Sequence, residues 1–305
     1  MSTAATPAQE FERRRAALAE RLQTLPDKPQ ETAAATLCAL WHRAAGESLS
    51  IEAAQQAALP ALDAAAEARL LELIESRLAG VPLAHLTGRQ RFMGLELLAG
   101  KEALIPRHET ELLGHAALGI LQRLTMTQQN PIVIDVCTGS GNLALALAHH
   151  EPKAMVFAAD LSVEAVELAR CNAAQLGLSD RVEMRAGDLL APFDEPRFHA
   201  SVDLLVCNPP YISSPKLATL PGEIGDHEPR LAFDGGPLGV RILQRLIRES
   251  PRYLKPAGWL AFEVGFGQGP AVLKRLSAQR DFDHTESVVD AGGEIRVVLG
   301  RRACP

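Results

Sequence analysis

The sequence predicts an α/β fold: a mainly parallel sheet with helices between its strands, preceded by a small helical domain. From Pro131 onward, short apolar runs alternate with helical patterns, as in consecutive βαβ units. Residues 1–80 are instead rich in Ala, Leu, Glu, Gln and Arg and contain almost no β-branched runs, which favours helices. We therefore expect a helical domain at 1–80, a β-hairpin linker at 81–108 and the α/β domain at 109–305.

Periodicity and turn residues predict the individual elements. In the first domain, amphipathic patterns predict helices over residues 11–25, 31–45, 50–56 and 62–78, the third capped by Ser50. Gly94, between residues 90–93 and 95–98, predicts a short hairpin. In the α/β domain we expect a helix from Glu109; strands at 132–137, 155–159, 181–186, 202–207 and 259–265; helices at 142–149, 163–176, 238–254 and 268–279; and a terminal hairpin of 284–289 and 295–299, with an antiparallel last strand.

Composition excludes several classes of function. The net charge is −6 and the pI is about 5.9, whereas proteins that live on nucleic acid usually show a basic footprint, so duplex DNA is disfavoured. The five cysteines form no C-x-x-C pair, which indicates reduced thiols in the cytoplasm and no metal site. No apolar run is long enough to cross a bilayer, and the first fifteen residues resemble no signal peptide. We expect a cytoplasmic monomer that contacts neither membrane nor nucleic acid.

The segment Asn208-Pro209-Pro210-Tyr211 is the strongest candidate for chemistry. It follows the buried strand 202–207, and two prolines cannot continue a strand because neither donates to the ladder. Ligands of open α/β sheets bind at this end of the strands. The Asn208 side-chain oxygen and the Pro209 carbonyl are two fixed acceptors for the N–H bonds of a planar amide or amino group, and Tyr211 is placed to stack on it. The alternative is a turn that merely ends the strand.

A second group of residues predicts a nucleoside site. Thr138-Gly139-Ser140-Gly141 joins a strand to a helix, so its backbone can pass close under a ligand. Asp160 ends the next strand about 20 residues later and is placed to accept the hydroxyls of a ribose, or to cap the following helix together with Ser162. Asp188, after the third strand, is expected to meet an adenine amino group.

Other charged positions are ambiguous from the sequence alone. Arg241, Arg245, Arg248 and Arg252 fall on one side of a predicted helix, which indicates a solvated face or, alternatively, a contact to RNA or an acidic partner. Arg107 and Glu109 have the character of ordinary surface charges. The long segment 212–236 has no clear periodicity, and loops of that length are usually functional or mobile.

The order of these motifs resembles the glutamine N5-methyltransferases that modify the Gly-Gly-Gln loop of peptide-chain release factors. The resemblance covers roughly residues 80–302. It includes Pro82-Leu83, Thr87-Gly88, Ile105-Pro106-Arg107-x-Glu109-Thr110-Glu111, Thr138-Gly139-Ser140-Gly141, Asp160, Asn208-Pro209-Pro210-Tyr211, Glu228-Pro229, Gly235-Gly236 and Arg296-Val297-Val298.

The resemblance implies a seven-stranded, Rossmann-like class I methyltransferase sheet and S-adenosylmethionine as methyl donor. Asn208, Pro209, Pro210 and Tyr211 would be catalytic. The donor would be held by Asp135, Thr138, Gly139, Ser140, Gly141, Asp160, Leu161, Asp188, Leu189 and Asn208. Substrate would be bound by Arg107, Glu109, Asn208, Tyr211 and Glu228, with no metal.

Some positions depart from the family pattern and keep alternatives open. Cys137 stands where the family usually has glycine, and His227-Glu228-Pro229 resembles the sister group that methylates a glutamine of a large-subunit ribosomal protein. His108 replaces a more usual proline. Two further alternatives are an adenine-N6 methyltransferase, because an exocyclic amine meets the same acceptors, and a donor-binding assembly factor without catalysis.

Overall fold

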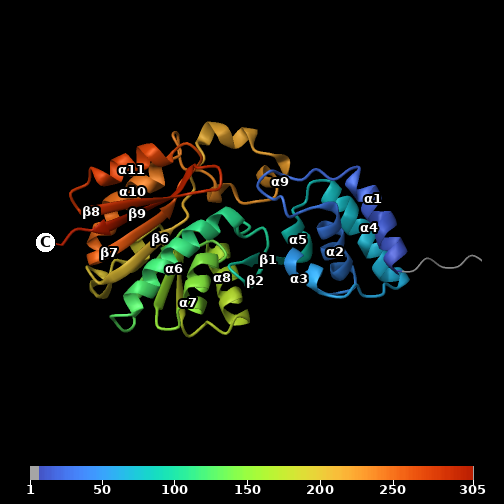
Figure 1. The fold of residues 1–305 in the computed structure, drawn as a ribbon, viewed down its shortest axis with the longest axis horizontal. Helices are drawn as coiled ribbons and strands as arrows, with labels where there is room; N and C mark the ends of the chain where they lie inside the picture. The colour runs from blue at the N-terminus through green and yellow to red at the C-terminus, as the bar shows by residue number, and fades with distance from the viewer. Residues whose placement is uncertain (1–6, 305) are drawn as a thin grey trace, which may run out of the picture. The chain divides into compact units, whose positions relative to one another are not determined.

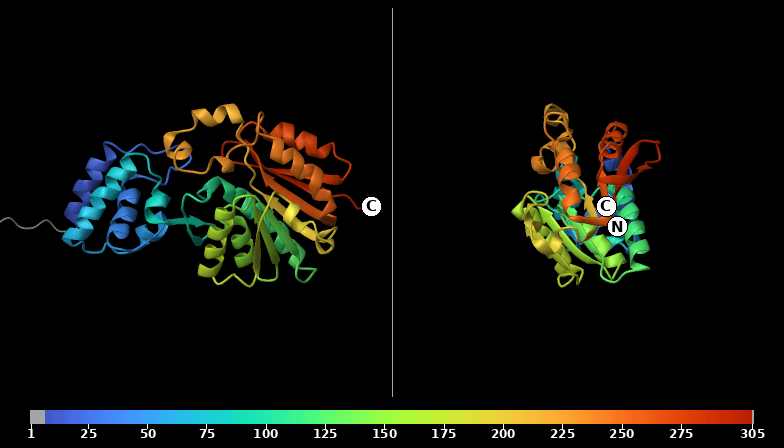
Figure 2. Two further views of the ribbon diagram at one scale, coloured as in Figure 1. Left: turned by 180° about the vertical axis from the view of Figure 1, so that it is seen from behind. Right: turned by 90° about the vertical axis from the view of Figure 1, so that its left-hand side faces the viewer.

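The computed structural model describes residues 7–304, which divide into two compact units. The first contains the chain up to Lys101 together with Pro221–His227, and the second contains Glu102–Leu220 and Glu228–Pro305. The chain therefore returns to the first unit for a short segment in the middle of the second. Figures 1 and 2 show the elements of each unit.

The first unit is helical. Its central helix, α2, packs against its neighbours through a core that includes Leu37, Leu40 and Trp41, and the Trp41 indole donates to the Pro60 carbonyl. Ser50 caps α3 by accepting from the Ala53 amide, as the sequence predicted. The elements are α1 (Pro7–Ala19), α2 (Ala33–Ala44), α3 (Ile51–Gln56), α4 (Ala64–Leu78), α5 (Leu83–Thr87), the antiparallel hairpin β1 (Arg89–Phe92) and β2 (Leu95–Leu98), and α9 (Gly222–Gly225).

A buried ion-pair cluster holds the returning segment in this unit. Glu223 accepts from Lys28 Nζ at 2.6 Å and from Arg77 Nη1 at 2.7 Å, and Arg77 Nη2 donates to Glu31 at 2.7 Å. All four side chains are at most 8% exposed, so two cations and two carboxylates balance each other out of contact with water. Burial raises the pKa of Glu31, whereas at Glu223 the hydrogen bond and charge of Lys28, with Arg77, outweigh burial and lower the pKa.

The second unit contains a seven-stranded sheet in the order β5-β4-β3-β6-β7-β9-β8. The last strand, β9, pairs antiparallel with both β7 and β8, which confirms the predicted antiparallel last strand. The strands are β3 (Ile132–Val136), β4 (Met155–Asp160), β5 (Val182–Ala186), β6 (Val202–Cys207), β7 (Leu254–Glu263), β8 (Phe282–Val289) and β9 (Ile295–Arg302). The chain builds β3, β4 and β5 in one direction and then returns to place β6 beside β3, which creates the switch point where such sheets bind ligands.

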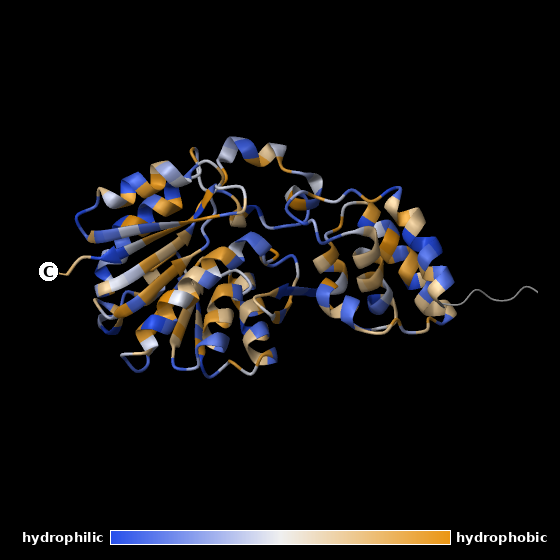
Figure 3. Ribbon diagram, viewed as in Figure 1, coloured by the Kyte–Doolittle hydropathy of each residue, from blue (hydrophilic) through white to orange (hydrophobic). Residues whose placement is uncertain are grey.

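Helices cover both faces of this sheet (Figures 1 and 2). The helices α6, α7 and α8 lie together on one face, and α10 and α11 contribute to the apolar cluster on the other. Every residue of β6 is buried, and the central strands are mainly hydrophobic (Figure 3). The helices are α6 (Glu111–Thr125), which follows a 3₁₀ turn at His108–Thr110, α7 (Asn142–His150), α8 (Val163–Gln175), α10 (Arg241–Glu249) and α11 (Gly269–Ser277).

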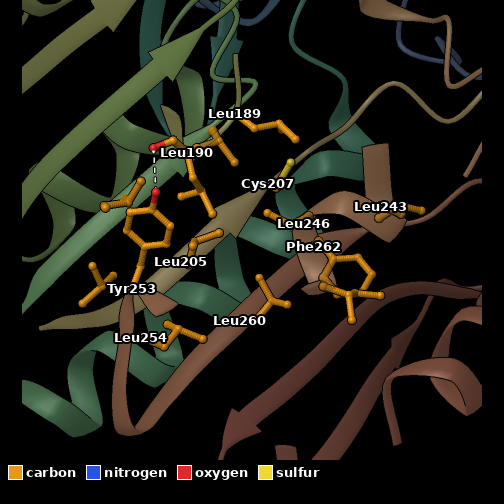
Figure 4. Close-up of a cluster of buried hydrophobic side chains, with 14 of the residues drawn as sticks. Leu189, Leu190, Leu205, Cys207, Leu243, Leu246, Tyr253, Leu254, Leu260 and Phe262 are labelled. Atoms are coloured by element: carbon orange, nitrogen blue, oxygen red, sulfur yellow. Dashed lines mark hydrogen bonds between the residues drawn. The ribbon is translucent and has the colours of Figure 1, made fainter. Parts of the chain in front are cut away.

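Figure 4 shows the part of the core that joins α10 to the sheet. Leu243 and Leu246 of α10 pack with Leu205 of β6 and Leu260 of β7, and the Tyr253 hydroxyl donates to the Leu190 carbonyl at 3.2 Å. This cluster holds β6, the strand that ends directly before Asn208.

The helix predicted over 238–254 was wrong at both ends. It begins only at Arg241, because Gly239 has a left-handed φ of +71° and a Cβ there would lie 2.3 Å from the Tyr211 carbonyl oxygen. It ends at Glu249, since Pro251 lies in a 3₁₀ turn that leads into β7. The helix predicted over 11–25 likewise ends early, at Ala19. No helix within the described range 7–304 is long and apolar enough to cross a membrane.

Candidate active site

A cavity of about 390 Å³ lies in the second unit, where the parallel strands end. Residues at or just after the ends of β3, β4, β5 and β6 contribute to its wall, among them Thr138, Asp160, Asp188 and Asn208. The sequence had placed ligand-binding residues at these four strand ends, and the structure brings them together around one cavity.

The glycine loop under the cavity requires an unusual backbone. Cys137, Gly139 and Gly141 have left-handed φ values of 60°, 55° and 83°. At Gly141 a Cβ would lie 3.1 Å from that of Ala169, whereas at Gly139 it would meet only Ala103, at 3.9 Å. The Gly139 backbone is thus open to a ligand, and α7 begins directly after the loop.

Asp160 ties the loop to the second strand. Its carboxylate accepts from the Gly139 amide at 2.8 Å and from the Ser162 amide at 2.9 Å, while Ser162 itself caps α8. Burial raises the pKa of Asp160, and these backbone hydrogen bonds oppose the rise. A carboxylate offers about four acceptor positions, so two amides leave room for the hydroxyls of a ribose.

Asp135 lies beneath the same loop and is fully buried. Its Oδ2 accepts from Thr138 Oγ1 at 2.5 Å and from the Ala144 amide at 3.2 Å, and its Oδ1 has no partner among residues 7–304. Burial raises the pKa of Asp135 to about 7. The Oγ of Ser140 also lacks a partner in the described part of the chain. Asp135 and Ser140 are not among the residues that line the cavity, so a direct contact of either one with the donor stays a prediction.

Asp188 lines the cavity but already has a partner. Arg245 Nη1 donates to both of its carboxylate oxygens, at 3.0 and 2.9 Å. A contact from Asp188 to an adenine amino group stays a prediction. Leu161 and Leu189 supply apolar wall on the same side.

Only part of Asn208–Tyr211 faces the cavity. Asn208 and Pro210 line it, Pro209 is buried behind them, and Tyr211 is not among the lining residues. The Tyr211 hydroxyl instead donates to Glu263 at 3.0 Å, so the structure does not place this ring for the stacking that the sequence suggested. Asn208 Nδ2 donates to Thr110 Oγ1 at 3.1 Å, and within residues 7–304 nothing donates to its Oδ1.

The predicted substrate-binding charges form two pairs. Arg107 lines the cavity and is hydrogen-bonded to Glu228, which also accepts from the Ile105 amide at 2.9 Å. Glu109 lies away from the wall and pairs with Arg296 at 3.3 Å. Arg107 and Glu228 therefore position the segment that leads into the site, in addition to any contact with substrate.

Sequence reasoning missed several residues of the site. Thr110 lines the cavity and contacts both Asn208 and Glu263, and Glu263 is a fully buried carboxylate at the end of β7. The signal for Glu263 was a charged residue at the carboxyl end of an otherwise apolar strand. Arg245 was assigned to a solvated helix face, but it lines the cavity together with Arg241.

Comparisons with known proteins identify the family. Residues 128–266 match the model of a methyltransferase domain. A release factor glutamine methyltransferase from Moorella thermoacetica is 40% identical over 78% of this chain and 81% of its own length, and one from Bradyrhizobium diazoefficiens is 36% identical over 97% and 96%. This chain belongs to the release factor glutamine methyltransferase family.

The solved structures agree on the fold. The catalytic domain of hMettl16, crystallised with an RNA hairpin, matches with a TM-score of 0.54 at 16% identity, over 75% of this chain and 81% of that one. The predicted class I methyltransferase fold is therefore confirmed. As a member of the release factor glutamine methyltransferase family, the chain is an enzyme that uses S-adenosylmethionine, and the open Gly139 backbone and Asp160, which both line the cavity, fit that donor.

Proposed function

We propose that this enzyme methylates the side-chain amide nitrogen of the glutamine in the Gly-Gly-Gln loop of peptide-chain release factors. The observation that carries the proposal is the free Asn208 Oδ1 at the cavity wall, on the opposite side of the amide from the Nδ2 that Thr110 holds. The family relatives, named for this substrate, support it over the ribosomal-protein and adenine alternatives.

The chemistry follows from the position of the acceptors. When bound, S-adenosylmethionine supplies an electrophilic methyl group. The substrate nitrogen would take up the methyl group, the pair of electrons of the broken bond would stay on the donor's sulfur, and one amide proton would leave to solvent. The nitrogen becomes positive during this step. Asn208 Oδ1, at the cavity wall, would orient its N–H bonds and stabilise that charge.

The remaining predicted residues would hold the donor. Thr138, the Gly139 backbone and Asp160 would bind its amino acid and ribose portions, and Leu161 and Leu189 would contact the base. Arg107, fixed by Glu228, would contact the substrate loop. We infer a cytosolic location because all five cysteines are free thiols.

A single assay tests the substrate assignment. Labelled donor is supplied with a folded release factor, its glutamine-to-alanine variant, the large-subunit ribosomal protein and duplex DNA. We expect label only in the unmodified release factor. Label that appears only in the ribosomal protein or in DNA would refute the proposal in favour of that alternative.

We further propose that the helical domain, 1–80, selects the protein substrate. One glutamine offers few atoms, so discrimination among proteins needs a wider surface. A chain that begins near Leu78 should bind donor normally, methylate the intact release factor poorly and methylate a short peptide comparatively well. Circular dichroism must first establish that it folds, because Glu223 loses its partners in this truncation. Native turnover of the intact factor by a folded truncated chain would show that the domain is structural.

A further inference from the structure

A chain of three hydrogen bonds runs behind the reactive side of the site. Asn208 Nδ2 donates to Thr110 Oγ1 at 3.1 Å, Thr110 Oγ1 donates to Glu263 Oε2 at 2.7 Å, and the Tyr211 hydroxyl donates to Glu263 Oε1 at 3.0 Å. Thr110 and Glu263 are both about 1% exposed, so water does not compete for these bonds. The chain runs from the Tyr211 hydroxyl through the buried Glu263 carboxylate and Thr110 to the Asn208 amide at the cavity wall.

The direction of these bonds follows from counting protons. A threonine hydroxyl has one proton, and a carboxylate can only accept. While Glu263 is ionised, the proton of Thr110 points to it, so Thr110 presents only lone pairs to Asn208. An amide can meet a lone pair with its N–H but not with its carbonyl oxygen. Asn208 must therefore turn Nδ2 to Thr110 and leave Oδ1 on the other side.

We propose that Glu263, acting through Thr110, sets the orientation of the Asn208 amide so that an acceptor and not a donor faces the substrate nitrogen. This inference rests on the proposed function. Glu263 and Thr110 are positioning residues, since they act on the reacting atoms only through Asn208. A rotated Asn208 would place N–H groups against the N–H groups of the substrate amide.

The groups around Glu263 make this orientation sensitive to pH. Burial raises the pKa of Glu263 to about 7; the neighbouring Glu109 adds to the rise, while Thr110, Tyr211 and Arg296 oppose it. Burial, together with the charge of Glu263, raises the pKa of Tyr211 well above its usual value, so Tyr211 stays protonated and donating. Once Glu263 is protonated, it can donate to Thr110, which frees the threonine proton for Asn208 Oδ1. The fixed orientation, and with it turnover, is then lost as the pH falls through about 7.

Substitutions at Thr110 test the chain of bonds. In Thr110→Val the shape is kept but the acceptor is gone. A buried N–H without a partner is costly, so Nδ2 should turn to the cavity and kcat should fall about 10-fold, with donor Kd unchanged within twofold. Thr110→Ser keeps the hydroxyl, so its kcat should fall less than threefold. The fall in kcat below pH 7 that we expect of the native enzyme should be absent in Thr110→Val. Equal losses in both variants, or a native kcat that is flat from pH 6 to 8, would overturn the proposal.

A second measurement needs neither substrate nor turnover. In protein labelled with ¹⁵N-asparagine, the side-chain amide signal that disappears in Asn208→Ala belongs to Asn208. We expect it to shift with pH with a midpoint near 7 in the native protein and not in Thr110→Val. A signal that does not respond between pH 6 and 8 would refute the orientation mechanism. A native protein that shows this titration but does not methylate release factor would refute the function and retain the bond chain.

Discussion

Replacing Glu223 with glutamine is expected to release the segment Pro221–His227 from the helical unit. The native cluster balances two cations with two carboxylates, and the substitution leaves Lys28 and Arg77, at 4% and 3% exposure, facing only Glu31. Removing one partner of a buried ion pair typically costs about 3–5 kcal/mol. Glu223 is the one buried side chain of its segment, so local detachment is a cheaper response than global unfolding.

Hydrogen exchange measured by mass spectrometry locates the effect. In and just after α9, the amides of Ile224, Gly225 and Asp226 donate to the carbonyls of Pro221 and Gly222. A cost of about 3 kcal/mol should speed their exchange about 100-fold, because about 1.4 kcal/mol corresponds to a factor of ten, while amides of the sheet exchange as before. The double variant Glu223→Gln/Lys28→Met restores charge balance and should recover at least tenfold of this protection.

Glu75→Gln is the matched control. It makes the same chemical change in the pair with Arg21, whose side chains are 64% and 58% exposed, and such surface pairs contribute about 1 kcal/mol or less. The reasoning would be refuted if Glu223→Gln changed exchange in α9 no more than twofold, or no more than Glu75→Gln does. If the amides of α9 exchanged as fast in the double variant as in Glu223→Gln, charge balance would not be the cause of their protection.

Three further predictions concern the catalytic unit. Asn208→Ala should lower kcat at least 100-fold by removing a positioned acceptor, with calorimetric donor affinity nearly unchanged. Asp160→Ala should weaken donor binding 10- to 100-fold in the same titration; normal binding would reduce Asp160 to a structural role. The raised pKa of Asp135, about 7 against 3.8 unfolded, means the native state holds its proton longer. As the pH rises from about 4 to 7, the contribution of Asp135 to the free energy of unfolding should therefore fall by roughly 1.4 kcal/mol per pH unit. The total free energy of unfolding should fall less steeply over this range in Asp135→Asn than in the native protein.

The central strands β3, β4 and β6 were predictable because each is a short, mainly apolar run. The apolar run 202–207 predicts a strand that ends before Pro209 and Pro210, and β6 does begin at Val202 and end at Cys207. The residues that end β3 and β4 were also predictable, since parallel strands bring their carboxyl ends to one edge. Local pattern and topology were sufficient for this part of the site.

Pairings between distant segments were not predictable from local pattern. Thr110 and Glu263 are 153 positions apart, and nothing in either neighbourhood indicates the other. The residue at which α10 begins could not be predicted either. It depends on the close approach of Gly239 to the Tyr211 carbonyl, a contact between segments that only the folded structure brings together. The segment Pro221–His227 looked like part of a long loop, because its partners Lys28 and Arg77 lie at the other end of the sequence.

The cluster around Glu223 has a consequence for how the protein is made. Lys28 and Glu223 are 195 positions apart, and Arg77 and Glu223 are 146 apart. A nascent chain emerges at about 5–20 residues per second, so the helical unit waits on the order of ten seconds between the synthesis of Lys101 and that of its last charged partner. During that interval its two interior cations share one carboxylate. The amino-terminal unit therefore completes its folding only after much of the catalytic unit has left the ribosome.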